Sequence, residues 1–189
     1  MNNLQKNHKK FSTSTMAVVA LMTAVLCVLA PFSIPVGVIP ISLATLGLYL
    51  AAIILGSKKA TVACLLYLLI GFVGLPVYSG FVGGPAKLLG PTGGYLCGYL
   101  LLTYITGWFV DKFPGKWKLC LLGMVLGTTA CYFMGTIWLA FQVKIGLSEA
   151  VMVGVVPFII GDIIKIVIAM WIGVTTRKAI VRASIAGSC

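Results

Sequence analysis

The chain reads AVMVGVVPFIIGDIIKIVIAMWIGVTT from residue 150 to residue 176, and its two ionisable side chains are Asp162 and Lys165. About 20 predominantly apolar residues are enough for an α-helix to cross the hydrocarbon core of a bilayer. The stretch therefore predicts a membrane-spanning helix that carries an acid and a base within the membrane.

The composition of the whole chain has the same character. Of its 189 residues, 60% are hydrophobic and 9% are charged, whereas an average soluble domain is about 45–50% apolar and about 25% charged. These proportions exclude a soluble protein and leave room for little besides five or six membrane helices. We expect one all-α integral membrane domain.

Charged residues and prolines divide the chain into six predicted spans. Residues 16–57 carry no formal charge and are long enough for two helices, which the proline-containing segment 31–40 separates, because proline removes a backbone donor. The predicted spans are residues 16–30, 40–56, 60–86, 88–110, 119–143 and 150–176. We therefore predict a single six-helix domain over residues 16–182, with a polar tail at residues 1–15 and a short tail at residues 183–189.

The cations are distributed unequally between the two sides of this arrangement. Eleven Lys and Arg residues fall in the tails and connections on one side, and two, Lys87 and Lys144, fall on the other. The positive-inside rule places the side with eleven cations in the cytoplasm, together with both termini. The outward connections are then residues 31–40, 75–91 and 143–150. A cleaved signal peptide is an alternative for the start of the chain, but Pro31 would follow the cleavage point, which is unfavourable.

The formal charge of +11 would suggest a nucleic-acid partner in a soluble chain. Here the cations lie between apolar runs, so we expect them to orient the chain in the lipid bilayer and we expect no nucleic-acid partner. The first outward connection is uncharged and contains Val36, Val38 and Ile39. It gains little from contact with water, so we expect it to fold back across the helices and cover an outward pocket.

Asp162 and Lys165 give the strongest signal for a site. An ionisable residue at the centre of a membrane helix costs about 2.5–3.5 kcal/mol, so such residues usually mark function. Residues three apart project to nearly the same helix face, where the carboxylate offers two acceptor oxygens and the ammonium three donors. The spacing predicts a binding site for a ligand that has N–H donors and a carbonyl or carboxylate. The alternative is a structural ion pair that neutralises itself.

A second candidate is the stretch Gly90-Pro-Thr92-Gly93-Gly94-Tyr95. Its glycines let the backbone approach a ligand closely, while Thr92 and Tyr95 add hydroxyl groups and an aromatic ring. A tight turn into the following helix is an equally good interpretation. The order of a phosphate-binding P-loop is missing from the chain, so we do not expect it to be an ATPase by itself.

Phe81 is a further candidate for the wall of an apolar pocket, although aromatic side chains also anchor membrane proteins at the interface. The six cysteines form no C-x-x-C motif and do not cluster with His8, so no metal site and no cofactor are predicted. Asp162 is the one carboxylate within a predicted span, and no histidine lies in a span. The sequence therefore predicts no catalytic site.

Three pairs of small residues are spaced for close helix packing. They are Ala20-x-x-x-Ala24, Gly94-x-x-x-Gly98 and Gly123-x-x-x-Gly127. Most such faces pack within a chain, but the first could instead be exposed to a partner subunit. The sequence leaves both interpretations open.

These motifs together resemble the substrate-binding S components of energy-coupling-factor (ECF) vitamin transporters, and in particular their biotin-specific BioY branch. The resemblance covers nearly the whole chain. The motifs that carry it are GLPVY at 74–78, LGPTGGYL at 89–96, GDxxK at 161–165 and the Ala20/Ala24 face.

The resemblance implies a six-helix protein of a prokaryotic cytoplasmic membrane that binds biotin from outside. A transmembrane coupling subunit of the EcfT type, docked on Ala20 and Ala24, and two ATPase subunits would supply the energy. Asp162 would accept hydrogen bonds from the ureido N–H groups of biotin, and Lys165 would donate to the ureido carbonyl or the tail carboxylate. A stand-alone small-molecule carrier or channel is the alternative, and a membrane-embedded enzyme fits less well.

Overall fold

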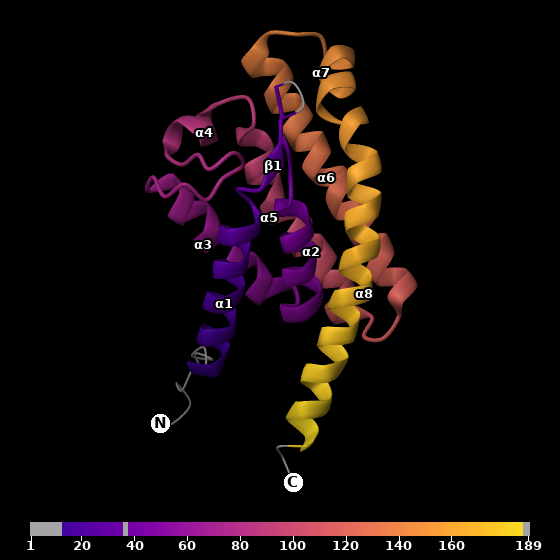
Figure 1. Cartoon of the computed structure of the whole chain (residues 1–189). Coiled ribbons are helices and arrows are strands. Elements are labelled where there is room, and N and C mark those ends of the chain that lie inside the picture. Colours follow the sequence, from indigo (N-terminus) through magenta and orange to yellow (C-terminus); the bar gives the residue numbers. More distant parts are fainter. Residues whose placement is uncertain (1–12, 36–37, 187–189) are drawn as a thin grey trace, which may run out of the picture.

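The computed structural model describes residues 13–35 and 38–186 (Figure 1). These residues form eight helices and one two-stranded antiparallel hairpin, in the order α1 (Thr13–Leu29), β1 (Ser33–Ile34), β2 (Ile41–Ser42), α2 (Ala44–Leu55), α3 (Ser57–Phe72), α4 (Pro85–Leu89), α5 (Gly93–Lys112), α6 (Trp117–Val143), α7 (Leu147–Gly154) and α8 (Val156–Ala186). Most of the two predicted tails, residues 1–12 and 187–189, lies outside the described residues. Residues 13–15 belong to α1, and residues 183–186 belong to α8.

The predicted all-α class is confirmed. Helices α1, α2, α3, α5, α6 and α8 have 17, 12, 16, 20, 27 and 31 residues and follow the order of the six predicted spans. The largest difference concerns the predicted span at residues 60–86, since α3 ends at Phe72. Gly74 has a φ of 115°, and Pro76 lacks a backbone donor, so the helix does not continue beyond this point.

The connections that the sequence predicts to face outward also contain structure that the sequence did not predict. Segment 31–40 contributes to the β1–β2 hairpin, and α4 and α7 are short helices within the other two connections. By length and composition, two helical segments among the described residues are suited to crossing a membrane, Trp117–Val143 and Leu147–Arg177. Helices α1 and α2 are shorter and also apolar.

Small residues decide how α5 packs against α6. A Cβ atom on Gly98 would lie 2.9 Å from Cys131 Sγ, and one on Gly127 would lie 2.8 Å from the backbone oxygen of Leu102. The two glycine pairs therefore pack within the chain. In contrast, Ala20 and Ala24 on α1 are both exposed.

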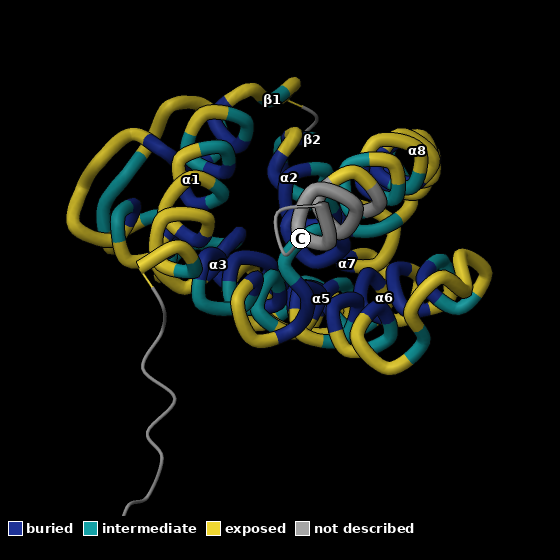
Figure 2. Tube along the Cα trace, turned by 90° about the horizontal axis from the view of Figure 1, so that it is seen from below, coloured by how far each residue is buried: buried dark blue, intermediate teal, exposed yellow. Residues whose placement is uncertain are grey.

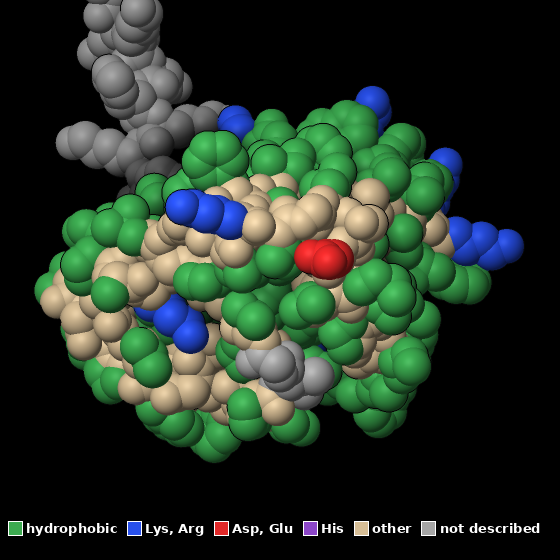
Figure 3. Space-filling view, turned by 90° about the horizontal axis from the view of Figure 1, so that it is seen from above, with side chains coloured by type: hydrophobic (Ala, Val, Ile, Leu, Met, Phe, Trp, Pro, Cys, Tyr) green, Lys and Arg blue, Asp and Glu red, His purple; other side chains and the backbone are tan. Residues whose placement is uncertain are grey.

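The helices α1 and α8 lie on opposite sides of the molecule, with α2 between them (Figures 1 and 2). The start of α1 and the end of α8 are at the same end, while the hairpin, α4 and α7 are at the other (Figure 1). Seen from that other end, the surface is largely hydrophobic and has few charged side chains (Figure 3). Buried residues line the inward faces of the helices (Figure 2).

Candidate functional site

Helix α8 brings Asp162 and Lys165 together in the interior, as their spacing predicts. Lys165 Nζ donates to Asp162 Oδ1 at 3.0 Å, and the two side chains are only 9% and 7% exposed, respectively. In the part of the chain that the structure describes, every buried side-chain nitrogen and oxygen has a hydrogen-bond partner. The polar atoms of the pair are therefore satisfied by groups of the protein itself.

Two side chains from other helices complete this network. Thr45 of α2 donates to Asp162 Oδ1 at 3.2 Å and accepts from Lys165 Nζ at 3.0 Å. Tyr132 of α6 donates to Asp162 Oδ2 at 2.5 Å. The acid and base thus connect α2, α6 and α8 at one level of the bundle.

A small cavity of about 40 Å³ lies directly beside the pair. By the volume that a buried water needs, it has room for roughly three water molecules. Its walls come from the hairpin region and from α2, α5, α6, α7 and α8. The lining residues are Ile39, Pro40, Ser42, Thr45, Tyr95, Tyr99, Cys131, Tyr132, Gly154, Phe158, Asp162 and Lys165. The cavity combines aromatic and apolar walls with a few converging polar groups, which is typical of a small-molecule site.

Three of the eight ligand-binding candidates from the sequence line this cavity: Asp162, Lys165 and Tyr95. The hydroxyl group of Tyr95 donates to the backbone oxygen of Gly154 at 3.0 Å and lies 3.3 Å from Thr136 Oγ1. It therefore holds the end of α7 against the start of α5, while its ring contributes to the cavity wall.

Gly90, Thr92, Gly93 and Gly94 are not among the residues that line the cavity. A Cβ atom would lie 1.7 Å from a backbone oxygen of α4 if placed on Gly93, and 2.3 Å from Trp138 Cβ if placed on Gly94. The indole of Trp138 donates to the Gly90 oxygen at 2.9 Å, and Thr92 donates to an α4 oxygen at 3.4 Å. This geometry matches the alternative interpretation of a tight turn into α5. The ligand contact of these four residues stays a prediction that the cavity does not support.

Phe81 also lies away from the cavity, in the loop between α3 and α4. Its side chain is 61% exposed, its φ is 58°, and its ring packs edge-on against Phe32 with a centroid distance of 5.5 Å. In the same loop, the buried Tyr78 donates to the Leu68 oxygen at 2.6 Å. Burial raises the pKa of Tyr78 to about 12. The loop is thus fixed by packing around Tyr78.

Sequence reasoning missed Thr45, Tyr99 and Tyr132 as cavity residues. A single hydroxyl group within an apolar span does not show which way its helix is turned, so Thr45 and Tyr132 give no signal alone. Tyr99 follows the predicted residue Tyr95 by four positions and therefore shares its helix face. That spacing could have identified it.

Comparison with known proteins agrees with this architecture. The BioY family model matches residues 4–182 of the chain. The chain is 34% identical over 175 residues to biotin transporter BioY2 of Lactococcus lactis subsp. cremoris (strain MG1363), with 93% of this chain and 94% of the relative covered. It is 38% identical over 158 residues to biotin transporter BioY of Thermotoga maritima, with 84% and 92% covered. Its structure matches a crystal structure of the S-component for biotin from an ECF-type ABC transporter with a TM-score of 0.82 and 33% identity, covering 93% of this chain and 95% of that chain. The chain belongs to the BioY family.

Proposed function

We propose that this chain is the biotin-binding S component of an ECF transporter in a prokaryotic cytoplasmic membrane. The observation that carries the proposal is the buried acid–base pair beside a cavity, within a fold that matches the S-component for biotin with a TM-score of 0.82. Relatives that cover most of the chain have names that give biotin as the transported molecule.

In this proposal six helices cross the membrane and both termini are cytoplasmic. The described start of α1 and end of α8 lie at the same end of the molecule, in agreement with an even number of crossings (Figure 1). The excess of eleven cations over two assigns that end to the cytoplasm. Residues 16–182 then form one substrate-binding domain between the two short tails.

The chemistry of the cavity complements biotin. The ureido ring of biotin has two N–H donors and one carbonyl acceptor, its thioether ring and aliphatic chain are apolar, and its tail ends in a carboxylate. Asp162 accepts from the ureido N–H groups, and Lys165 donates to the ureido carbonyl or to the tail carboxylate. Tyr95, Tyr99 and Phe158 supply the apolar wall.

Binding requires the cavity to widen, because about 40 Å³ is far below the roughly 300–1,000 Å³ of ligand sites. In this proposal the wall formed by Ile39, Pro40 and Ser42 moves, since these residues lie in or next to a hairpin whose strands have two residues each. Biotin enters from this end of the molecule, which is the extracytoplasmic end in the proposed orientation.

The coupling subunit docks on the Ala20 and Ala24 face of α1, and two ATPase subunits energise transport. Both alanines are exposed on a helix at the edge of the bundle, which supports this part of the proposal (Figure 2). An Ala24→Trp variant should retain biotin binding and lose energised uptake. Equal uptake by the variant and the parent chain would contradict this docking face.

The test is a titration of the purified chain in lipid nanodiscs with biotin, thiamine and riboflavin. One saturable site for biotin, with no binding of the other two vitamins, is expected. Failure to bind biotin would overturn the proposal. Proteoliposomes with and without the coupling module then separate an S component from a stand-alone carrier, because the carrier would accumulate biotin without ATPase subunits.

A further inference from the structure

An apolar groove runs along the outside of the molecule between α6 and α8. Its upper part is a hollow of about 710 Å³, whose mostly apolar lining includes Val125 and Ile163 and also reaches Asp162 and Tyr132 of the candidate site. Its lower part is a hollow of about 420 Å³, whose lining includes Leu121, Val167 and Trp171. Leu121 and Val125 are one helical turn apart, as are Ile163 and Val167, so the two hollows follow one another along the same helix pair.

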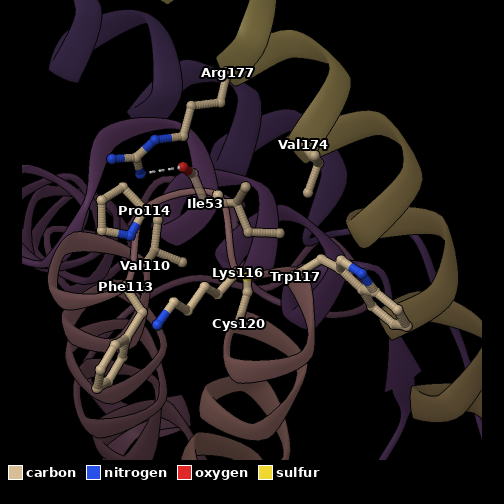
Figure 4. Close-up of a pocket in the computed structure, with 10 residues that line it drawn as sticks. Ile53, Val110, Phe113, Pro114, Lys116, Trp117, Cys120, Val174 and Arg177 are labelled. Carbon is tan, nitrogen blue, oxygen red and sulfur yellow. Dashed lines mark hydrogen bonds between the residues drawn. The ribbon is translucent and has the colours of Figure 1, made fainter.

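A basic pocket of about 380 Å³ continues this groove at the end of the molecule where α8 finishes. Its walls include Lys116 and Arg177, and it shares Trp117 and Val174 with the lower part of the groove (Figure 4). No acidic side chain is among its lining residues. The pocket and the groove therefore form one continuous surface with a cationic end and a mostly apolar length, and its acidic residue, Asp162 of the candidate site, lies in the upper part away from the cations.

The two cations of this pocket differ in their partners. Arg177 Nη1 donates to the Ile53 backbone oxygen at 2.7 Å, and its Nη2 lies 3.7 Å from Asp111 Oδ1. Lys116 is in neither of the two ion pairs found among the described residues, and its Nζ lies 6.0 Å from the centroid of the Phe113 ring. Helix α6 also begins beside the pocket, at Trp117, and adds the partial positive charge of its N-terminus. The site is thus able to hold an anion at Lys116.

We propose that the pocket and groove bind one anionic phospholipid of the inner leaflet. Its phosphate lies between Lys116 and Arg177, and one acyl chain lies between α6 and α8. Basic pockets between membrane helices on the cytoplasmic side are suited to anionic headgroups, and the apolar groove is suited to hydrocarbon. The inference uses the membrane orientation proposed above but does not depend on the identity of the transported molecule.

A lipid fits this surface better than a protein partner does. The face proposed for the coupling subunit is on α1, and Figure 2 shows α1 on the opposite side of the molecule from α6. The groove follows α6 and α8, and its cations lie at one end. A phospholipid has the same arrangement, with a charged headgroup at one end and long apolar acyl chains.

Native mass spectrometry of the full chain tests the inference. The protein is released from nanodiscs that contain equal amounts of phosphatidylglycerol and phosphatidylcholine, and the lipids that remain bound are counted. The parent chain should retain one phosphatidylglycerol in preference to phosphatidylcholine. Lys116→Gln should reduce this preference about fivefold, the effect of one cation near an anionic headgroup. Lys59→Gln is the matched control, since it removes an exposed cation outside the pocket and should change nothing.

A second pair of variants tests the groove. Val167→Trp adds bulk inside the groove without changing charge, whereas Ile160→Trp adds the same bulk at an exposed site of α8 that is not among the groove residues. The first should lower lipid retention and the second should not.

Four results would overturn the inference. The first two are equal retention of the two lipids, and an equal loss of lipid preference in Lys116→Gln and Lys59→Gln. The third is displacement of the lipid by inorganic phosphate alone. The fourth is a lipid-free dimer as the dominant species, which would show that a second copy of the chain covers the groove. Biotin titrations of the same variants keep the two proposals separate. Lys116→Gln should bind biotin as the parent does, so loss of lipid with intact biotin binding bears on the lipid site alone.

Discussion

Helix α8 takes part in two ion pairs that differ in burial and in what they connect. Lys165 and Asp162 are 3.0 Å apart, lie three residues apart on one helix and are almost fully buried. Arg177 and Asp111 are 3.7 Å apart, join two helices and are 31% and 44% exposed. By the rise of an α-helix, Lys165 and Arg177 are about 18 Å apart along α8.

The second pair is part of a structural junction. Asp111 accepts hydrogen bonds from the backbone nitrogen and the hydroxyl group of Ser57 at 2.7 and 2.8 Å, which fixes the start of α3 against the end of α5. Arg177 donates to the backbone oxygen of Ile53 and so adds α2 and α8 to the junction. The pair of Arg177 and Asp111 therefore has a structural role, whether or not Arg177 also contacts a lipid.

The first pair also joins helices, because Thr45 of α2 and Tyr132 of α6 form hydrogen bonds with it. Unlike the second pair, however, it places both charges in the interior, and burying both charges is costly. The cavity beside them supplies an explanation, since a ligand can exchange hydrogen bonds with both groups. Burial and the space beside an ion pair therefore indicate its function better than its length or the number of helices that it joins.

Lys165→Ala should have the largest effect on biotin binding. The substitution leaves the Asp162 carboxylate without its cation and removes a proposed donor to biotin. Biotin affinity should fall at least tenfold, by about 1.4 kcal/mol or more, in a chain that still folds. Titration calorimetry measures the affinity, with Lys118→Ala at the surface as the control. Unchanged affinity in a folded Lys165→Ala chain would make the first pair structural, like the second.

Tyr132→Phe is expected to act on stability. The variant removes the hydroxyl group that donates to Asp162 Oδ2 and leaves a buried carboxylate oxygen short of one donor. The free energy of unfolding should fall by about 1.5–3 kcal/mol, the range for hydrogen bonds to charged groups. Thermal unfolding in detergent compares it with Tyr104→Phe, which changes an exposed tyrosine of α5. Equal stability of the two variants would show that the Tyr132 hydroxyl group contributes nothing to the network.

Arg177→Gln should have a still smaller effect on stability and none on binding. Partly exposed ion pairs contribute about 0–1 kcal/mol, and the Arg177 pair is partly exposed. The midpoint of thermal unfolding should drop slightly, whereas the biotin dissociation constant should stay within twofold of the parent value. A tenfold loss of biotin affinity would show that the two ion pairs act together, and would contradict a purely structural role for the pair of Arg177 and Asp111.

The smallest expected signal is a change in amide exchange when biotin binds. Exchange at residues 41–43, next to the cavity wall, should slow, because the widened site is then filled. Exchange in the turn at residues 113–117, at the other end of the molecule, should not change. If amide exchange slowed equally in both segments, biotin would stabilise the whole protein and not a local site.

The sequence predicted the features that depend on composition and on spacing along one helix. Apolar runs and charged connections located the long helices, and the three-residue separation of Asp162 and Lys165 put both side chains on one face. The apolar segment 31–40 was expected to fold back over a pocket, and Ile39 and Pro40 do line the cavity.

The features that depend on contacts between helices were not predictable in this way. Thr45 and Tyr132 reach Asp162 from α2 and α6, and their positions depend on how those helices rotate and cross. The glycines of the GPTGGY stretch were ambiguous for a physical reason. A missing side chain permits the close approach of a ligand or of a neighbouring helix equally well, and at Gly93 and Gly94 the neighbour is protein.

The central claim is that the buried carboxylate of Asp162 binds the transported molecule. Calorimetric titration of biotin into Asp162→Asn tests it most directly, since asparagine keeps the shape of the side chain and removes its charge. Glu149→Gln makes the same chemical change at an exposed site on α7 and is the control. We expect affinity to fall at least tenfold in Asp162→Asn and to stay unchanged in Glu149→Gln. Equal affinity in the two variants would contradict the claim.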